Sequence, residues 1–146
     1  MRRLFGFVLA GALIILGHGT AYAQNKQMYT GDIVVLAYAV NADKTADYDQ
    51  VMAKVKDALM KSEKPEAKQQ LAGWKVMRAA KPQPDGSILY VHIINPVKDA
   101  DYSLTNIVYD VVKDPAEQKA FFELYRGALK AALFGIEGAV TADLSK

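Results

Sequence analysis

The chain of 146 residues contains no cysteine. This absence excludes disulfide bonds, and it also excludes a lipid anchor, which would be attached at a cysteine following the export signal. Histidine is nearly absent too, since His18 and His92 are the only two. Zinc sites normally use several histidine or cysteine ligands, so we expect no zinc site in this chain. The stability of the fold must come from packing, with or without a partner chain.

Several motifs that carry chemistry are also missing. The chain has no P-loop, no G-x-G-x-x-G and no G-x-S-x-G, so nucleotide binding and serine hydrolysis have no support. The acidic stretch lacks the spacing of an EF-hand. Its four aspartates are interpreted as helix caps and as solvated surface residues; they are Asp99, Asp101, Asp110 and Asp114. We therefore expect no metal and no cofactor.

The only long apolar run, Leu4–Gly17, lies at the start of the chain. Arg2 and Arg3 precede it, and the small-x-small sequence AYA follows it, ending at Ala23. This is typical of an export signal cleaved before Gln24. The arginine pair leaves the twin-arginine route open beside the general secretory route, and an uncleaved anchor is a further alternative. We expect a periplasmic or secreted protein with no stable membrane span after cleavage, since no later segment approaches about 18 consecutive apolar residues.

Removal of the signal changes the charge balance. Arg2 and Arg3 belong to the 18 basic residues, so the chain from Gln24 onwards has as many basic as acidic residues, of which there are 16. Such a chain has no overall attraction to nucleic acid or to anionic lipid. We expect no nucleic-acid partner.

Residues 32–140 are predicted to form one α+β domain, between a flexible segment 24–31 and a tail 141–146. The apolar run 32–40 reads as a strand covered on both faces. Thr45 is a candidate N-cap of the following helix, and Pro65 ends this helix or opens a short extra turn through Gln70. The apolar residues of the helix recur at three- to four-residue spacing: Tyr48, Val51, Met52, Val55 and Leu59.

The second half of the domain repeats this plan. Residues 71–81 and 87–97 read as two strands joined by a turn over 82–86, which contains proline and glycine. Residues 104–111 have helical spacing but also fit an extended segment. Asp114, Pro115 and Glu117 form a helix start, and Gly135 is a plausible helix stop. The apolar face of that helix comprises Phe121, Leu124, Tyr125, Ala128 and Ala132.

The order strand, helix, strand, strand, helix over residues 32–135 resembles the dimeric α+β barrel superfamily. That group includes the antibiotic-biosynthesis monooxygenase-like and stress-responsive barrel families. The resemblance rests on element order and on the runs Val34–Tyr38 and Leu89–Ile93, and it includes no catalytic motif. It implies a ferredoxin-like antiparallel sheet with helices on one face, in which the first and third strands are central.

This fold requires a fourth strand beside the first. Only Ile136–Val140 is available for it, and this segment contains Gly138. If it does not pair, residues 32–40 become a bare apolar edge, and such edges are normally covered. We therefore expect a homodimer in which sheets or edges of two chains meet.

Candidate site residues follow from the register of the predicted hairpin. If Lys81 lies opposite Ser87, then Trp74, Arg78, Tyr90 and His92 share one face of the sheet. A slip of one residue would replace Trp74 and Arg78 by their neighbours. The face would offer aromatic rings, one cation and one imidazole, which suits a planar or carboxylated small molecule. The alternative is an ordinary core or dimer face.

Three tyrosines, Tyr38, Tyr48 and Tyr125, are expected to converge between sheet and helices, as part of a site or as packing. Some members of the resembling fold bind haem, which would make His92 a haem ligand. The function we expect is an exported domain that binds a small ligand or partner as a dimer. The alternatives are a cofactor-independent monooxygenase-like enzyme acting on an aromatic or polyketide-like substrate, and a purely structural role.

Overall fold

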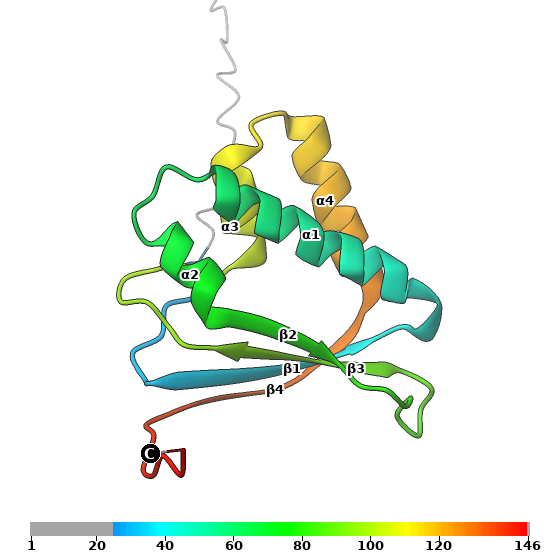
Figure 1. The fold of residues 1–146 in the computed structure, drawn as a ribbon. Coiled ribbons are helices and arrows are strands. Elements are labelled where there is room, and N and C mark those ends of the chain that lie inside the picture. Colours follow the sequence, from blue (N-terminus) through cyan, green and yellow to red (C-terminus); the bar gives the residue numbers. More distant parts are fainter. Residues whose placement is uncertain (1–24, 146) are drawn as a thin grey trace, which may run out of the picture.

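The computed structural model describes residues 25–145. The expected signal and its cleavage site, Ala23 and Gln24, lie outside these residues. Four strands form one antiparallel sheet in the order β2-β3-β1-β4, and the helices pack over one face of it (Figure 1). The expected α+β class, with a ferredoxin-like sheet and helices on one face, is thus confirmed. No described helix is long and apolar enough to cross a membrane.

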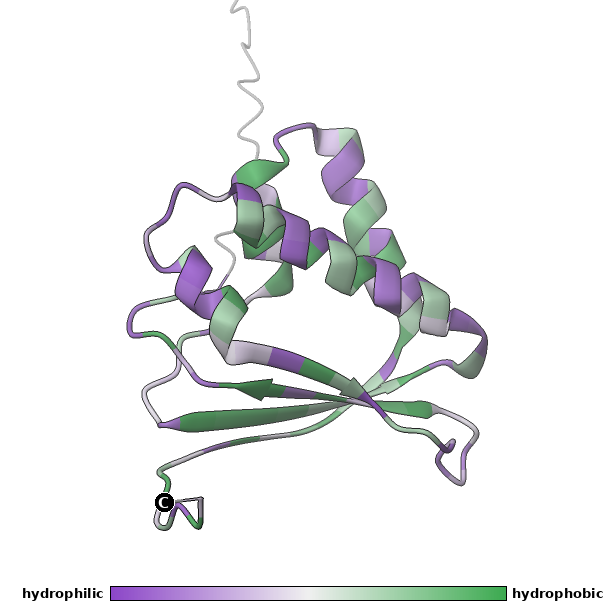
Figure 2. Cartoon of the chain, viewed as in Figure 1, coloured by the Kyte–Doolittle hydropathy of each residue, from purple (hydrophilic) through white to green (hydrophobic). Residues whose placement is uncertain are grey.

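The two central strands are β1 (Ile33–Val40) and β3 (Ile88–Ile94), as expected from their apolar sequences. They pair along their length, with Leu36 opposite His92 and Tyr38 opposite Tyr90. Both strands are green over most of their length in Figure 2 because most of their residues are hydrophobic, as is typical of strands inside a sheet.

The fourth strand is longer than expected and begins earlier. β4 (Leu129–Gly138) follows α4 without a loop and pairs with the whole of β1, from Val40 opposite Leu129 to Ile33 opposite Gly138. The condition under which residues 32–40 would form a bare edge is therefore not met, and a dimer that joins two such edges loses its support. β4 was hidden because its alanine-rich start fits a helix as well as a strand, and backbone pairing with β1 decides between them.

Two predictions about the last helix fail for the same reason. Ala132 lies in β4 opposite Tyr38 and does not belong to the helix face. Gly135 lies opposite Leu36 in the same strand and is not a helix stop. α4 (Pro115–Ala128) ends at Ala128, where the amide of Leu129 still donates to the carbonyl of Tyr125.

The first helix starts differently from its prediction. α1 (Thr45–Lys61) follows a short 3₁₀ turn, Ala42–Lys44, and its N-cap residue is Lys44. Thr45 is the first helical residue, so the prediction that it is the N-cap is wrong. The 3₁₀ turn leads directly into the helix, and the N-cap position therefore falls one residue earlier. α1 buries the expected apolar face, including Tyr48, Val51 and Val55.

The segment after Pro65 forms a true helix, α2 (Ala67–Gly73), which takes the first residues of the predicted strand 71–81. β2 (Trp74–Arg78) is correspondingly short. The carbonyl of Gly73 accepts a hydrogen bond from the amide of Asn95 at 2.8 Å. A Cβ at Gly73 would lie 2.8 Å from the Asn95 carbonyl oxygen, so only glycine fits where the helix meets β3.

The remaining helix, α3 (Leu104–Val111), settles the ambiguity of residues 104–111 in favour of a helix. The predicted start of α4 is confirmed, since Asp114 Oδ1 accepts hydrogen bonds from the amides of Ala116 and Glu117, at 2.7 and 3.1 Å. α1, α3 and α4 share one buried cluster that includes Val55, Val108 and Phe121. This cluster packs the helices on one another. Two smaller clusters, built around Val34 with Ile94 and around Val40 with Tyr90, include the buried residues of the sheet.

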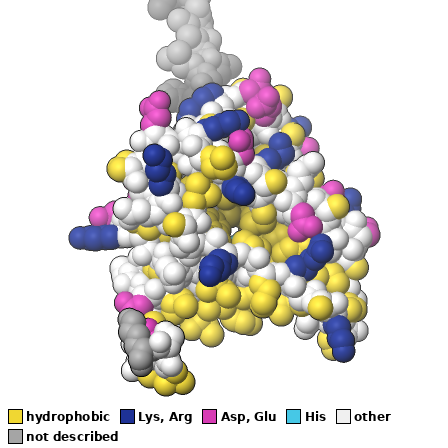
Figure 3. Space-filling view, viewed as in Figure 1, with side chains coloured by type: hydrophobic (Ala, Val, Ile, Leu, Met, Phe, Trp, Pro, Cys, Tyr) yellow, Lys and Arg dark blue, Asp and Glu magenta, His cyan; other side chains and the backbone are white. Residues whose placement is uncertain are grey.

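No described helix covers the other face of the sheet, here called the outer face (Figure 1). Its side chains form a row across all four strands, Met77, Val91, Ala37 and Phe134, because each is paired with the next. Met77 and Phe134 are each 52% exposed, and Ile136 is 61% exposed. Hydrophobic side chains follow the lower edge of the molecule in Figure 3, under the sheet.

We predict that Asp114→Ala lowers the free energy of unfolding by about 1 kcal/mol, because two backbone N–H groups at the start of α4 lose their acceptor. Urea unfolding followed by circular dichroism measures the change. Asp114→Asn is the matched control, since its amide oxygen can still cap the helix and stability should stay close to the original. An equal loss in both variants would show that the carboxylate charge, and not the cap, matters.

Candidate functional site

His92 lies at the centre of the helix-facing side of the sheet and is 1% exposed. Its neighbours in the same row are Val76 on β2 and Leu36 on β1. Its imidazole makes two hydrogen bonds: Nε2 lies 2.9 Å from the Tyr48 hydroxyl, and Nδ1 accepts from Trp74 Nε1 at 3.2 Å. Strand β3, strand β2 and helix α1 thus meet at one side chain.

These bonds determine the tautomer of His92. The indole N–H of Trp74 can only donate, so Nδ1 of the imidazole must be its unprotonated acceptor. The ring proton then resides on Nε2, which donates to the Tyr48 hydroxyl oxygen. Burial lowers the pKa of His92 to about 4, so the ring is neutral at neutral pH. Both nitrogens are occupied, and neither is free to ligate a metal or a haem iron.

Aromatic rings surround this imidazole. The ring centroid of His92 is 5.2 Å from that of Tyr38 and 5.7 Å from that of Trp74, and both rings are tilted against it. Trp74 in turn contacts Tyr102 with centroids 5.4 Å apart. Tilted arrangements at these distances are favourable for aromatic pairs. The rings build one rigid wall on the helix-facing side of the sheet.

A cavity of about 220 Å³ lies against this wall, between the sheet and helices α3 and α4. Half of the residues that line the cavity are aromatic, and several polar groups reach it. The aromatic residues are Tyr38, Trp74, His92, Tyr102, Phe122 and Tyr125, and the polar ones are Gln27, Ser103, Thr105 and Arg126.

Two hydroxyl groups of the lining are unused. Among residues 25–145, neither Tyr38 nor Tyr125 has a hydrogen-bond partner for its hydroxyl, although both side chains are half-buried. Burial is the main cause that raises the pKa of each phenol, to about 12 for Tyr38, while Arg126 acts in the opposite direction on Tyr125. Both phenols therefore remain protonated at neutral pH and can donate as well as accept.

The structure brings together four of the six candidate residues. His92, Trp74, Tyr38 and Tyr125 line the same cavity. Tyr48 also converges on this place, through its bond to His92. The convergence of the three tyrosines between sheet and helices, expected from the sequence, is therefore observed.

The other two candidates, Arg78 and Tyr90, lie on the same face of the sheet but do not line the cavity. The predicted register is confirmed, with Arg78 opposite Tyr90 and Val76 opposite His92. Both side chains are directed to one carboxylate on α1: the Arg78 guanidinium lies 3.1 Å from Asp49 Oδ2, and the Tyr90 hydroxyl donates to Asp49 Oδ1 at 2.8 Å. The cation expected at the site thus serves to tie β2 and β3 to α1.

A different cation, Arg126, lines the cavity where Arg78 was expected. Arg126 lies one residue after Tyr125 on α4, lines the cavity, and has no ion-pair partner among residues 25–145. Arg126 lies four residues after Phe122 on α4, so helical periodicity places these two side chains on one face, and this spacing could have indicated Arg126 from the sequence. No such signal existed for Gln27 of segment 24–31. The backbone N–H of Gln27 donates to Asp101 Oδ1, and its backbone carbonyl accepts from the backbone N–H of Tyr102. These bonds hold Gln27 in the cavity wall.

Within the described residues, no group of three or more histidine, cysteine, aspartate or glutamate side chains could hold a metal ion. Comparison with models of known protein families, with curated proteins and with solved structures finds no match to the chain.

We predict that His92 makes the protein less stable as the pH falls from about 6.5 to about 4. Within this window the imidazole of the unfolded chain binds a proton, while the buried ring resists protonation. The loss from this group is about 3 kcal/mol when complete. Urea unfolding of the original chain and of His92→Gln at a series of pH values measures this loss. The difference between the two chains separates the contribution of His92 to the free energy of unfolding from that of the carboxylates.

The His92→Gln variant should show a flatter pH dependence over this window. Nuclear magnetic resonance provides a second measurement that needs no variant, because the ring protons of His92 report its protonation directly. A titration midpoint near pH 6.5 in the folded protein would contradict the burial of a neutral imidazole.

Proposed function

We propose that this protein is an exported homodimeric domain that binds a small planar aromatic molecule in the cavity beside His92. The observation that carries the proposal is the pair of unused hydroxyls, Tyr38 and Tyr125, in a cavity lining of which half of the residues are aromatic. Ligand sites are typically apolar cavities with a few well-placed polar groups. This description fits the cavity, whereas a filled core would leave no free hydroxyls.

The cavity also indicates the size and chemistry of the ligand. Its volume of about 220 Å³ is below the range of about 300–1,000 Å³ that is common for drug-sized ligands, which favours a single-ring molecule. The aromatic wall suits a planar ring. A phenolic, carbonyl or carboxylate substituent would meet the Tyr38 and Tyr125 hydroxyls, with Arg126 adding attraction for a negative charge.

His92 serves this site as a positioning residue. Its bonds to Trp74 and Tyr48 hold two rings in fixed orientation, and the buried neutral imidazole has no free nitrogen with which to accept a proton. A general base acts best with a pKa near the working pH, and a pKa of about 4 is well below it. This supports binding over acid–base catalysis by His92.

Dimerisation rests on the outer face of the sheet, since β1 is paired on both sides and offers no bare edge. The row Met77, Val91, Ala37 and Phe134 is apolar across the whole sheet, and Ile136 lies beside it. A large exposed apolar patch on a protein typically marks an interaction surface. A second copy of the chain, packed sheet to sheet, would bury this patch and would agree with the proposed relationship to the dimeric α+β barrel superfamily.

The alternative, a cofactor-independent monooxygenase-like enzyme, draws on the same two hydroxyls. Tyr38 and Tyr125 could orient the hydroxyl of an aromatic or polyketide-like substrate while oxygen reacts with it. Oxygen uptake that depends on a polycyclic phenol and is lost in Tyr125→Phe would favour the enzyme. Binding of the same phenol without oxygen uptake favours the ligand-binding domain.

We predict that the protein binds methyl para-hydroxybenzoate, a neutral phenol, and that Tyr125→Phe weakens this binding about fivefold, because one hydrogen bond is lost. Calorimetry measures the affinity. Tyr109→Phe is the matched control, since the Tyr109 hydroxyl donates to the Gln118 carbonyl outside the cavity, and its affinity should not change. Equal affinities for the original chain and Tyr125→Phe would contradict the site.

We predict that the protein purified from the periplasm of its host is a dimer of chains that begin at Gln24, and that Phe134→Glu converts it to a monomer by placing a charge on the outer face. Native mass spectrometry gives the chain mass, the oligomeric state and any retained ligand together. Met60→Glu is the control, because Met60 is 64% exposed on α1 and lies off this face. A monomeric original chain at tens of micromolar would contradict the dimer.

A further inference from the structure

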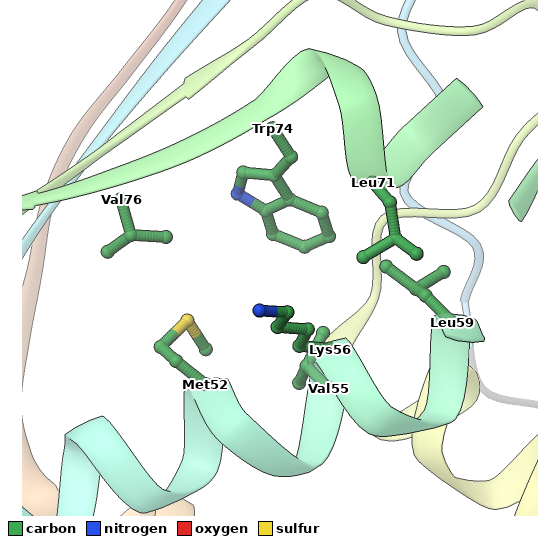
Figure 4. A pocket seen from close by; sticks show the side chains of 7 residues that line it. All are labelled: Met52, Val55, Lys56, Leu59, Leu71, Trp74 and Val76. Carbon is green, nitrogen blue, oxygen red and sulfur yellow. The ribbon is translucent and has the colours of Figure 1, made fainter. Parts of the chain in front are cut away.

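A second pocket lies between α1, α2 and β2, on the other side of Trp74 from the cavity beside His92. Its volume is about 330 Å³. Its walls are apolar: Val55 and Leu59 come from α1, Leu71 from α2, and Trp74 and Val76 from β2. Figure 4 shows these side chains directed from three elements towards a common open space. Because α2 replaces the start of the predicted strand, a helix closes one end of this space.

One charged side chain enters this apolar pocket. Lys56 is the only ionisable residue of its lining. In Figure 4 its side chain rises from α1, and its ammonium group lies in the open space between Met52 and the indole of Trp74. Lys56 is exposed, so its ammonium keeps its contact with water while its hydrocarbon stem lies beside the apolar walls. A negative partner at the ammonium is favourable.

The protein itself does not supply this partner. The residues three and four positions away from Lys56 on α1 carry no carboxylate; they are Met52, Ala53, Leu59 and Met60. Within residues 25–145, no ion pair to Lys56 is formed.

The carboxylates nearest to Lys56 along α1 are already engaged. Asp57 is paired with Lys61 at 2.7 Å, and Asp49 with Arg78 at 3.1 Å. The charge of Lys56 is therefore available to a ligand in the pocket.

We propose that this pocket binds an amphipathic carboxylate of medium chain length, with its hydrocarbon part against Trp74, Leu59 and Leu71 and its carboxylate at the Lys56 ammonium. The apolar walls favour burial of hydrocarbon. The single cation provides the complementary charge and sets the orientation. A small inorganic anion would leave the walls exposed to water, and a cationic amphiphile would meet a like charge.

This site is separate from the cavity beside His92, and Trp74 is the wall between them. One side of the indole lines the pocket with Lys56, while Nε1 donates to His92 Nδ1. Trp74 is also the single tryptophan of the chain. Its fluorescence therefore reports a ligand on either side, and substitutions on each side distinguish the two sites.

The test is a titration of the exported, purified protein with decanoate below its micelle concentration, followed by the fluorescence of Trp74, with decanol as the uncharged analogue. We expect saturable binding of decanoate, stronger than that of decanol. Lys56→Met keeps the apolar stem and removes the charge. It should weaken decanoate binding about fivefold and leave decanol binding unchanged.

Two further variants complete the design. Lys54→Met is the matched control, because Lys54 is exposed on the same helix but does not line the pocket, and it should bind decanoate normally. Val76→Phe adds a ring on a wall residue that is 40% exposed and should exclude both ligands. If this variant fails to fold, the comparison of Lys56→Met with Lys54→Met decides alone.

Three outcomes would overturn the proposal. One is the absence of any saturable change with decanoate. Another is an equal loss of affinity in Lys56→Met and Lys54→Met, which would show attraction by overall charge. The third is decanoate binding that survives Lys56→Met but is lost in Tyr125→Phe, which would place the carboxylate in the cavity beside His92.

Discussion

The pairing of β1 on both sides is the constraint on which the rest of the structure depends. β3 and β4 together satisfy the backbone groups of β1, so the most apolar strand lies inside the sheet. Its side chains then divide between two environments. Leu36 and Tyr38 face the helices, where Tyr38 joins the cavity lining. Ala37 faces outwards in the apolar row, although its own side chain is buried among its neighbours. The candidate site and the candidate dimer surface are opposite faces of the same strand.

Trp74 has a comparable role within the helix-facing layer. As the first residue of β2, it stands where α2 ends and the sheet begins, and its indole separates two pockets of different chemistry. The pocket on one side is apolar with a single ammonium, and the cavity on the other side holds phenols and an arginine. The hydrogen bond to His92 holds the indole between them. Occupation of either pocket would therefore act on a side chain that the other one shares.

Local patterns predicted those elements whose signals are contained in a few neighbouring residues. The cap at Asp114, the helical face of α1 and the register that places Arg78 opposite Tyr90 were all readable, because each depends on short-range spacing. The strand conformation of Gly135 could not be predicted from its neighbours, because it depends on pairing with β1, which lies far away in the sequence. Arg78 was placed on the correct face, but its pairing with Asp49 arises only when α1 crosses the sheet.

The sequence by itself determined the α+β order, the apolar centre of the sheet, the absence of disulfides and part of the aromatic set near His92. It indicated Tyr38, Trp74 and Tyr125, whereas Tyr102 and Phe122 emerge only from the structure. Only the tertiary structure decided which of those residues share a cavity, which cation accompanies them, and that the apolar surface is a sheet face rather than a strand edge. The physical reason is that periodicity specifies which face of an element a side chain occupies. Which groups satisfy one another across elements depends on how the helices cross the sheet.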